Sequence, residues 1–385
     1  MMAAITAAEA GASVTLLEKN EKLGKKLYIT GKGRCNLTNT CELPAFFENI
    51  PRGSKFLYSA IYSFSNDDTR TFFEAAGLPL KEERGGRIFP VSDKSSDVIK
   101  TLEKRLKEAG VKVRLKTEVK DLSALDADAI VIATGGLSYK STGSTGDGFR
   151  FAESLGHTIK DPVPSLVPLL CEDAFIKELE GLSLRNINVT VTADGKKIFE
   201  QFGEMLFTAN GVSGPVILTA SSEVGRMLNQ KQKEFLLHID LKPSLTFEQL
   251  DKRVLRDFES EQNKAFKNSL SKLLPAKMIP VIISLSGIDP FKKVNEITKA
   301  ERTALVKLLK DLTLHLSETA GFEQAVITSG GVNLKEIDPK TMESKKNPGI
   351  FFAGEVIDAD AYTGGFNLQI AFSTGRAAGE AAAKE

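Results

Sequence analysis

Cysteine and histidine are scarce in this sequence, and their spacing excludes the usual disulfide and zinc frameworks. The 385 residues include three cysteines, Cys35, Cys41 and Cys171. Because three cysteines make no disulfide framework, a reducing compartment fits best. The histidines lie far from one another and from the cysteines along the chain, so no metal site is predicted. Each is expected on a strand or at the surface; they are His157, His238 and His315.

The sequence also lacks an excess of one charge and any long apolar run. Its 51 Lys and Arg balance 50 Asp and Glu, so no nucleic-acid partner is predicted. No apolar stretch approaches the roughly 18 to 20 residues that cross a bilayer, so no membrane partner is predicted either. The first residues have no basic region and include Glu9, which argues against a secretory signal. A cytoplasmic protein is expected.

What is present is the composition of an ordinary globular enzyme. The sequence is 42% hydrophobic and 26% charged, far from the composition of disordered chains. Its length suits about two to three domains, each with its own core.

The first residues have the pattern of a nucleotide-binding βαβ unit that is already under way. Residues 2–10 form a predicted alanine-rich helix ended by Gly11, and residues 13–17 a short buried strand ending at Glu18. In such units a strand and a glycine-rich turn precede the helix, and the acidic residue binds a ribose. We therefore expect the first strand and turn to be missing. Alone, Glu18 is weak evidence, because an acidic residue after an apolar strand is more often a solvated strand end.

Five further segments continue the α/β pattern. An amphipathic helix over 96–109 and an alternating strand over 111–119 are predicted. Apolar runs at 129–133 and 349–353 each lead into a glycine turn, which is typical of central parallel strands. A final helix is predicted over 367–383. The two ends of the chain are therefore expected to build one domain with the middle inserted.

The middle of the chain has an antiparallel pattern instead. Alternating segments flank the hairpin turn Asp194-Gly195, and further strands are predicted over 234–241 and 312–316. Helices are predicted between those strands, over 247–259, 263–274 and 299–310. The predicted boundaries are 1–159 and 323–385 for the α/β domain, 160–242 and 311–322 for the β domain, and 243–310 for a small helical domain.

Three glycine-dense segments, at 24–36, 134–148 and 354–369, carry the predicted chemistry. Glycine lets backbone N–H groups point at an anion, and nearby cations neutralise phosphate charge. The third segment also opens the last helix, whose N-terminus stabilises electron-rich atoms. The alternative for the first segment is an ordinary surface loop, whereas the glycine density of the second exceeds what an ordinary loop needs.

Several motifs closely resemble those of the family of FAD-dependent oxidoreductases called the YhiN or BaiN family. They are Gly31-Lys-Gly-Arg-Cys-Asn-Leu-Thr-Asn39, Ala133-Thr-Gly-Gly-Leu-Ser138, Thr142-Gly-Ser-Thr-Gly-Asp-Gly148, Thr341-Met-Glu-Ser-Lys345 and Gly364-Gly-Phe-Asn-Leu-Gln369. The match spans essentially the whole chain. It implies an α/β fold, with a discontinuous Rossmann-like FAD-binding domain, an inserted antiparallel β-barrel-like domain and a small helical domain. Relatives begin with the strand and turn that are absent here, so either the start is misassigned or the chain is truncated.

The same resemblance implies which residues bind the FAD. Glu18 would contact the adenosine ribose, Lys26 would lie near the pyrophosphate, and Val119 beside adenine. Arg34 and Asn36 are also the candidate catalytic residues. The implied cofactor-binding set is Glu18, Lys19, Lys26, Gly31, Gly33, Arg34, Cys35, Asn36, Val119, Thr134, Gly135, Gly136, Gly354, Glu355, Asp358, Gly365, Asn367 and Leu368.

Three functions follow from these observations. In the first, NAD(P)H reduces the flavin, which passes hydride to a small organic acceptor such as an activated C=C bond. In the second, Cys35 and Cys41 act as a flavin-linked thiol-disulfide reductase, although their Cys-x5-Cys spacing is unusual. In the third, the chain is a pseudoenzyme or a non-enzymatic module that binds a nucleotide or RNA. The substrate, the choice between NADH and NADPH, and the oligomeric state are not predicted.

Overall fold

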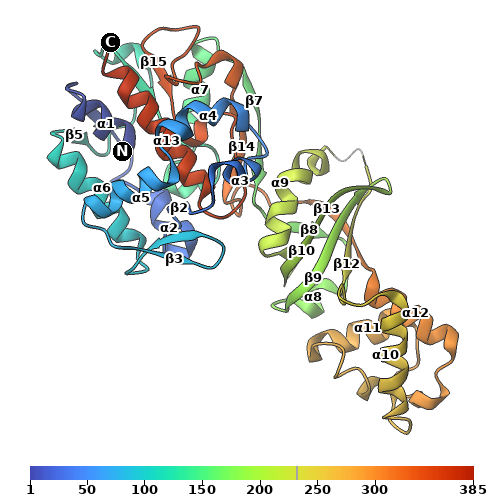
Figure 1. Ribbon diagram of the computed structural model, residues 1–385. Coiled ribbons are helices and arrows are strands. Elements are labelled where there is room, and N and C mark those ends of the chain that lie inside the picture. Colours follow the sequence, from blue (N-terminus) through green and yellow to red (C-terminus); the bar gives the residue numbers. More distant parts are fainter. Residues whose placement is uncertain (231–232) are drawn as a thin grey trace. The chain divides into compact units, whose positions relative to one another are not determined.

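The computed structural model describes residues 1–230 and 233–385, which divide into two compact units (Figure 1). Unit 1 contains Met1–Ser165 and Gly321–Glu385, and unit 2 contains Leu166–Ala320. The two ends of the chain therefore share one unit, and unit 2 is inserted between them. Within the described ranges, no helix has the length and apolar character needed to cross a membrane.

Unit 1 has the mixed α/β character that the sequence predicts. Helix α1 (Met2–Glu9) leads to β1 (Thr15–Leu17), which pairs in parallel with β5 (Lys112–Arg114). Strand β6 (Ile130–Ile132) pairs in parallel with β15 (Ile350–Phe352), so the apolar runs near both ends of the chain become neighbours. The strand predicted over 111–119 was too long.

The physical reason is local. Strand β5 is exposed along its length, and Lys116 takes a left-handed conformation with φ 53°, which ends the extended run. The alternation of that segment therefore does not reflect a half-buried strand.

The remaining elements of unit 1 surround these parallel pairs. An antiparallel sheet has the order β2–β4–β3, and β7 pairs antiparallel with β14. The strands are β2 (Thr38–Asn39), β3 (Leu80–Glu83), β4 (Arg87–Pro90), β7 (Ile159–Ser165) and β14 (Ile327–Val332). The helices are α2 (Lys25–Gly33), α3 (Leu43–Glu48), α4 (Ser54–Ser63), α5 (Asn66–Ala75), α6 (Ser95–Glu108) and α7 (Asp147–Ser154).

The last helix, α13 (Phe366–Ala382), is largely buried, and it packs against α1 and α4 (Figure 1). Its Gln369 is 0% exposed. The Gln369 amide accepts a hydrogen bond from the Thr38 hydroxyl (2.7 Å) and donates one to the carbonyl of Phe64 (3.0 Å). Because a buried amide must be paired, these bonds fix the register of α13 against β2 and the end of α4.

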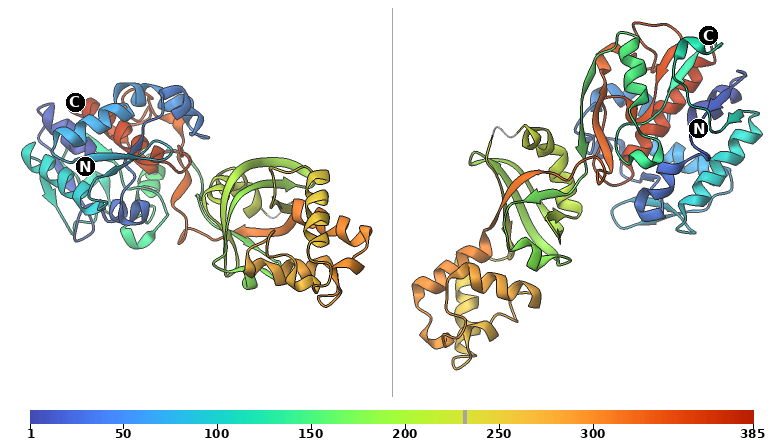
Figure 2. Two further views of the ribbon diagram at one scale, coloured as in Figure 1. Left: turned by 60° about the horizontal axis from the view of Figure 1, so that its bottom comes forward. Right: turned by 180° about the vertical axis from the view of Figure 1, so that it is seen from behind.

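Unit 2 contains a closed six-stranded antiparallel barrel with the order β10–β11–β8–β13–β12–β9 (Figure 2). Burial alternates along β12, so that one face of each strand fills the barrel. The predicted antiparallel barrel is therefore confirmed, including the hairpin turn at Asp194-Gly195. The strands are β8 (Leu169–Cys171), β9 (Ser183–Ala193), β10 (Lys196–Thr208), β11 (Gly211–Ser213), β12 (Phe235–Asp240) and β13 (Leu312–Thr319), and α8 (Ile176–Leu179) and α9 (Pro215–Asn229) complete this part.

Helices α10 (Phe247–Glu259), α11 (Ile279–Ser286) and α12 (Lys299–Lys310) lie between β12 and β13 in the chain. The helix predicted over 263–274 was wrong. There the N–H of Phe266 donates to the carbonyl of Lys292, and the N–H of Val294 donates to that of Lys264. Backbone groups that a helix would pair internally are thus paired between two loops.

We expect Gly379→Ala to destabilise unit 1 although alanine favours helices. A Cβ at Gly379 would collide with the backbone of Ala3 in α1, and α1 cannot yield without moving as a whole. The expected loss is about 1 to 3 kcal/mol of unfolding free energy, the usual cost of overpacking, measured by urea denaturation. The matched control is Gly375→Ala, one turn earlier, where the new Cβ would lie 3.3 Å from the side chain of Met2. Equal losses in both variants would contradict this account.

Candidate functional site

The first glycine-dense segment ends in an irregular turn that depends on glycine. Helix α2 begins after Gly24 in a left-handed conformation (φ 70°), and its last turn is interrupted at residues 30–32. Gly33, Arg34 and Cys35 then alternate in φ, at 83°, −99° and 61°. The N–H groups of Arg34 and Cys35 donate to the carbonyls of Gly31 (3.3 Å) and Thr30 (3.1 Å), so they close this turn and position Asn36, which follows it.

All three glycine-dense segments meet at Lys26. The Lys26 ammonium lies 2.6 Å from Oε2 of Glu355 and donates to the Ser138 hydroxyl at 2.8 Å. The other Glu355 oxygen accepts hydrogen bonds from the Ser138 hydroxyl (2.9 Å) and from the N–H of Thr328 (2.8 Å). Gly136 passes so close that a Cβ would collide with the hydroxyl of Thr328. We call Lys26, Ser138, Thr328 and Glu355 the Lys26 cluster.

The N-terminus of α13 lies against β2, which follows the first glycine-dense segment. Gly365 precedes the helix with φ 101°, and a Cβ there would collide with the carbonyl of Thr38. The side-chain amide of Asn39 donates to the carbonyl of Gly364 at 3.1 Å. No side chain of a described residue caps α13, so the first N–H groups of the helix keep their preference for negative charge.

Asn36 presents a polar atom that the described part of the chain does not satisfy. Its Oδ1 is buried and has no hydrogen-bond partner there. A buried acceptor without a donor costs free energy, and in functional sites it commonly marks where a ligand binds. The predicted role of Asn36 in cofactor binding is therefore consistent with its unpaired side-chain oxygen, although the role itself stays a prediction.

The predicted residues Glu18 and Lys19 contact the second glycine-dense segment. Lys19 lies 2.5 Å from Oδ2 of Asp147, and Glu18 accepts two hydrogen bonds from Asn20, whose amide also donates to the carbonyl of Thr142 (3.0 Å). Burial by itself would raise the pKa of Asp147, but the hydrogen bond and charge of Lys19 outweigh it, so this pKa is lowered. The strand end and the second segment are therefore held together by charge.

Other predicted residues have structural partners. The side-chain amide of Asn367 makes two hydrogen bonds to the backbone of Ala361: it accepts one from the N–H (2.9 Å) and donates one to the carbonyl (2.7 Å). These bonds fix the loop before α13. Asp358 donates its backbone N–H to the carbonyl of Val332. Val119 and Leu368 pack at the edges of apolar clusters. Gly31, Gly135 and Gly354 all have positive φ, and Thr134 lies beside Gly148, where a Cβ would collide with its hydroxyl.

Arg34, a candidate catalytic residue, is bound to the antiparallel sheet. Its guanidinium donates to Glu83 and to Asp93 and lies 4.2 Å from the centre of the Phe89 ring. The hydrogen bonds that Arg34 donates, first to Glu83 and then to Asp93, raise the pKa of Arg34, so it is always charged. Its charge is balanced by two carboxylates, and its catalytic role stays a prediction.

The two cysteines of the dithiol hypothesis are poor nucleophiles in this structure. Cys35 is fully buried in an apolar cluster, and burial raises its pKa to about 12. Burial also raises the pKa of Cys41, which packs against a different cluster. Because the thiolate is the reactive form, this arrangement disfavours a Cys35/Cys41 couple.

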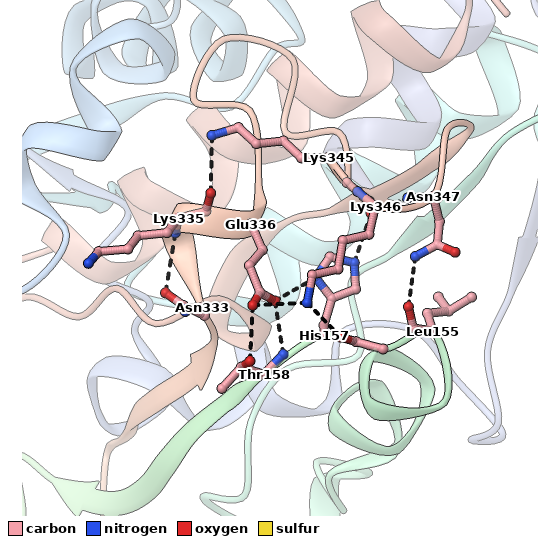
Figure 3. Close-up of polar contacts among 11 residues, drawn as sticks. Leu155, His157, Thr158, Asn333, Lys335, Glu336, Lys345, Lys346 and Asn347 are labelled. Carbon is pink, nitrogen blue, oxygen red and sulfur yellow. Dashed lines mark hydrogen bonds and ion pairs between the residues drawn. The ribbon is translucent and has the colours of Figure 1, made fainter.

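Sequence reasoning missed the environment of His157. The residue is 4% exposed and lies between α7 and β7, so the expectation of a strand or surface histidine was wrong here. Its ring nitrogens contact Glu336 (3.2 Å) and Ser344 (2.8 Å). Figure 3 shows His157 beside Glu336. Residues so far apart in sequence give no spacing signal. The only hint was the Thr341–Lys345 motif, which contains Ser344.

We expect thiol-labelling to separate the cysteines. At pH 7.5 iodoacetamide should leave Cys35 unmodified in the folded protein and label Cys41 slowly, whereas in urea all three cysteines react. Mass spectrometry of the digested protein locates each label, and Cys41→Ser should remove the slow site. Rapid labelling of both Cys35 and Cys41, or a disulfide between them, would revive the dithiol hypothesis.

Comparison with known proteins agrees with this architecture. The model of the HI0933-like protein Rossmann domain matches residues 1–381. A 3-dehydro-bile acid delta(4,6)-reductase of Clostridium scindens is 32% identical over 399 aligned residues, which cover 100% of this chain and 96% of that protein. The expectation of a truncated chain is not borne out by these comparisons.

Two ribosomal RNA dihydrouridine synthases are also similar. The Haemophilus influenzae protein is 30% identical, with 95% of this chain and 92% of that protein covered. The Escherichia coli protein is 29% identical, with 97% and 93% covered. Together with the family match over nearly the whole length, these relatives show that the chain belongs to the HI0933-like family of flavin-dependent oxidoreductases with a Rossmann domain.

Proposed function

We propose that the chain binds FAD noncovalently at the Lys26 cluster and uses NAD(P)H to reduce an activated C=C bond of a small organic acceptor in the cytoplasm. The observation that carries this proposal is the convergence of three glycine-dense segments on one ion pair, whose two residues lie 329 positions apart in the sequence. Ordinary surface loops have no reason to converge in this way.

The residues present fit such a cofactor. FAD carries an anionic pyrophosphate, a ring N–H donor and ring carbonyl acceptors. The side chain of Lys26 supplies positive charge, the buried Oδ1 of Asn36 lacks a donor in the described part of the chain, and the glycines at 136 and 365 keep side chains away from the backbone. When bound, the flavin supplies hydride transfer.

The chain itself contributes binding and orientation. Glu355 holds the ammonium of Lys26 in place while its second oxygen is fixed by Ser138 and Thr328. The N–H groups that open α13 stabilise negative charge that develops nearby. Asn367 keeps the preceding loop in position.

The acceptor class is inferred from the relatives. The names delta(4,6)-reductase and dihydrouridine synthase both denote saturation of a C=C bond. We infer an acceptor whose double bond is conjugated to a carbonyl, since conjugation lets the acceptor carbon take up hydride. A small molecule is favoured over RNA because the net charge of +1 provides no basic excess.

We expect Lys26→Ala to weaken FAD binding at least about tenfold, the usual worth of one charge-assisted contact to phosphate. Lys22→Ala is the matched control, since Lys22 is exposed and its ammonium lies 5.5 Å from the centre of the Tyr28 ring. The measurement is flavin fluorescence quenching on titration with protein. Equal affinities for the two variants would remove Lys26 from the site.

Anaerobic NADH and NADPH should each be tested for bleaching of the flavin absorbance near 450 nm, and the reduced protein then mixed with acceptors. A conjugated steroid enone should restore the flavin absorbance and become saturated. Restoration by a uridine-containing ribosomal RNA fragment alone would instead identify RNA as the substrate. If the protein takes up no FAD, the proposed function fails.

A further inference from the structure

His157 lies at the centre of a buried polar cluster outside the proposed cofactor site (Figure 3). Its Nε2 is 2.8 Å from the hydroxyl of Ser344, and its Nδ1 is 3.2 Å from Oε2 of Glu336. These residues come from the loop before β7, from the short 3-10 helix Leu334–Glu336 and from the loop before β15. The imidazole thus joins three segments of unit 1.

The pattern of donors assigns the proton on the ring. The hydroxyl oxygen of Ser344 accepts the backbone N–H groups of Lys346 (3.1 Å) and Asn347 (2.9 Å). With both lone pairs engaged, the hydroxyl must donate its own hydrogen to Nε2 of His157. Nδ1 therefore carries the ring hydrogen and donates it to Glu336. Only the neutral imidazole satisfies both contacts.

Two charged groups face the imidazole, Glu336 and Lys346. Burial by itself would raise the pKa of Glu336, but bonds from Thr158 and Lys346 outweigh it and hold this pKa at about 2. The Lys346 ammonium lies 3.0 Å from Glu336 and binds the carbonyl of Gly156 at 2.6 Å. The ammonium of Lys345 donates a hydrogen bond to the backbone carbonyl of Lys335.

Burial lowers the pKa of His157 below its ordinary value of 6.5, and Glu336 only partly opposes this. The uncharged phenyl ring of Phe352 also packs against the imidazole, edge-on and with a distance of 5.0 Å between the two ring centroids.

The cluster is linked to the Lys26 cluster through β15. The loop containing Ser344 forms backbone pairs with that strand, and the N–H of Phe352 donates to the carbonyl of Met342 at 3.0 Å. Phe352 ends β15, and Glu355 follows three residues later. Whatever fixes Phe352 therefore also fixes the turn that presents Glu355 to Lys26.

We propose that His157 is a positioning residue: its neutral imidazole fastens the 338–349 loop and Phe352, and thereby holds Glu355 in place at the cofactor site, whereas protonation releases them. The link to FAD rests on the proposed function above. A protonated Nε2 would point a hydrogen at a serine oxygen that has no free lone pair, so the Ser344 contact must break. Since the unfolded chain takes up this proton near pH 6.5 and the folded chain only at lower pH, stability from this residue is complete above pH 6.5 and declines below it.

The test is hydrogen–deuterium exchange of peptides covering 338–355 in the full chain from pH 5 to 8, corrected for intrinsic exchange. In the parent protein exchange should rise about tenfold on the acid side, as expected for the loss of one buried hydrogen bond. In His157→Gln, which does not titrate, the rise should vanish. Glu336→Gln removes the anion that favours imidazolium and should move the midpoint to lower pH. Ser344→Ala removes the conflicting hydroxyl and should move it to higher pH.

His315→Gln is the matched control, because His315 is an exposed histidine paired with Asp173 in unit 2. It should keep the parent profile. A parent profile without an acid rise, or the same rise in His157→Gln, would overturn the proposal. FAD affinity is measured in parallel, and it should fall about tenfold over the same pH range only when His157 is present.

If the FAD affinity stays constant over the pH range in which exchange rises, the positioning role is overturned. If no FAD binds at any pH, the proposed function fails, while the exchange profiles still decide whether His157 fastens the loop.

Discussion

The close approach of α13 to its neighbours is the constraint on which the rest of unit 1 depends. Glycine at 365 lets the helix start directly against β2, and glycine at 379 lets α1 lie against it near its other end. Between these points the buried Gln369 amide permits one register, because any shift would leave its donors and acceptors unpaired. The polar site between the first and last segments of the chain therefore depends on this alignment.

That alignment brings Lys26 and Glu355 together. Both side chains are about one fifth exposed, so water screens the ion pair only in part. The ion pair contributes to the site less through its electrostatic attraction than through its fixed geometry. The hydrogen bonds from Ser138 and Thr328 hold the carboxylate of Glu355 in a single orientation. A charge held in this way is ready for a ligand without further ordering, which reduces the entropy cost of binding.

The sequence was sufficient for features that depend on local pattern or on a long motif. The helix over 96–109, the turn at Asp194-Gly195 and the family-level architecture of Rossmann-like domain and barrel are confirmed, because periodicity, turn chemistry and motif similarity agree there. The helix over 263–274 failed because tertiary backbone pairing overrode its pattern. His157 was misjudged, and Ser138 and Thr328 were missed, since their partners lie between 27 and 217 residues away in sequence. The predicted site residues stay predictions, although those of all three segments do converge.

The place where the chain leaves and re-enters unit 1 has an evolutionary consequence. Ser165 and Ile327 are direct partners in the antiparallel pair of β7 and β14, so the ends of the intervening chain start as neighbours. A short hairpin turn would therefore suffice to close unit 1 at this point. Because Thr328 of the Lys26 cluster directly follows Ile327, an exchange of the inserted domain is compatible with the cofactor site only when it preserves this strand pair.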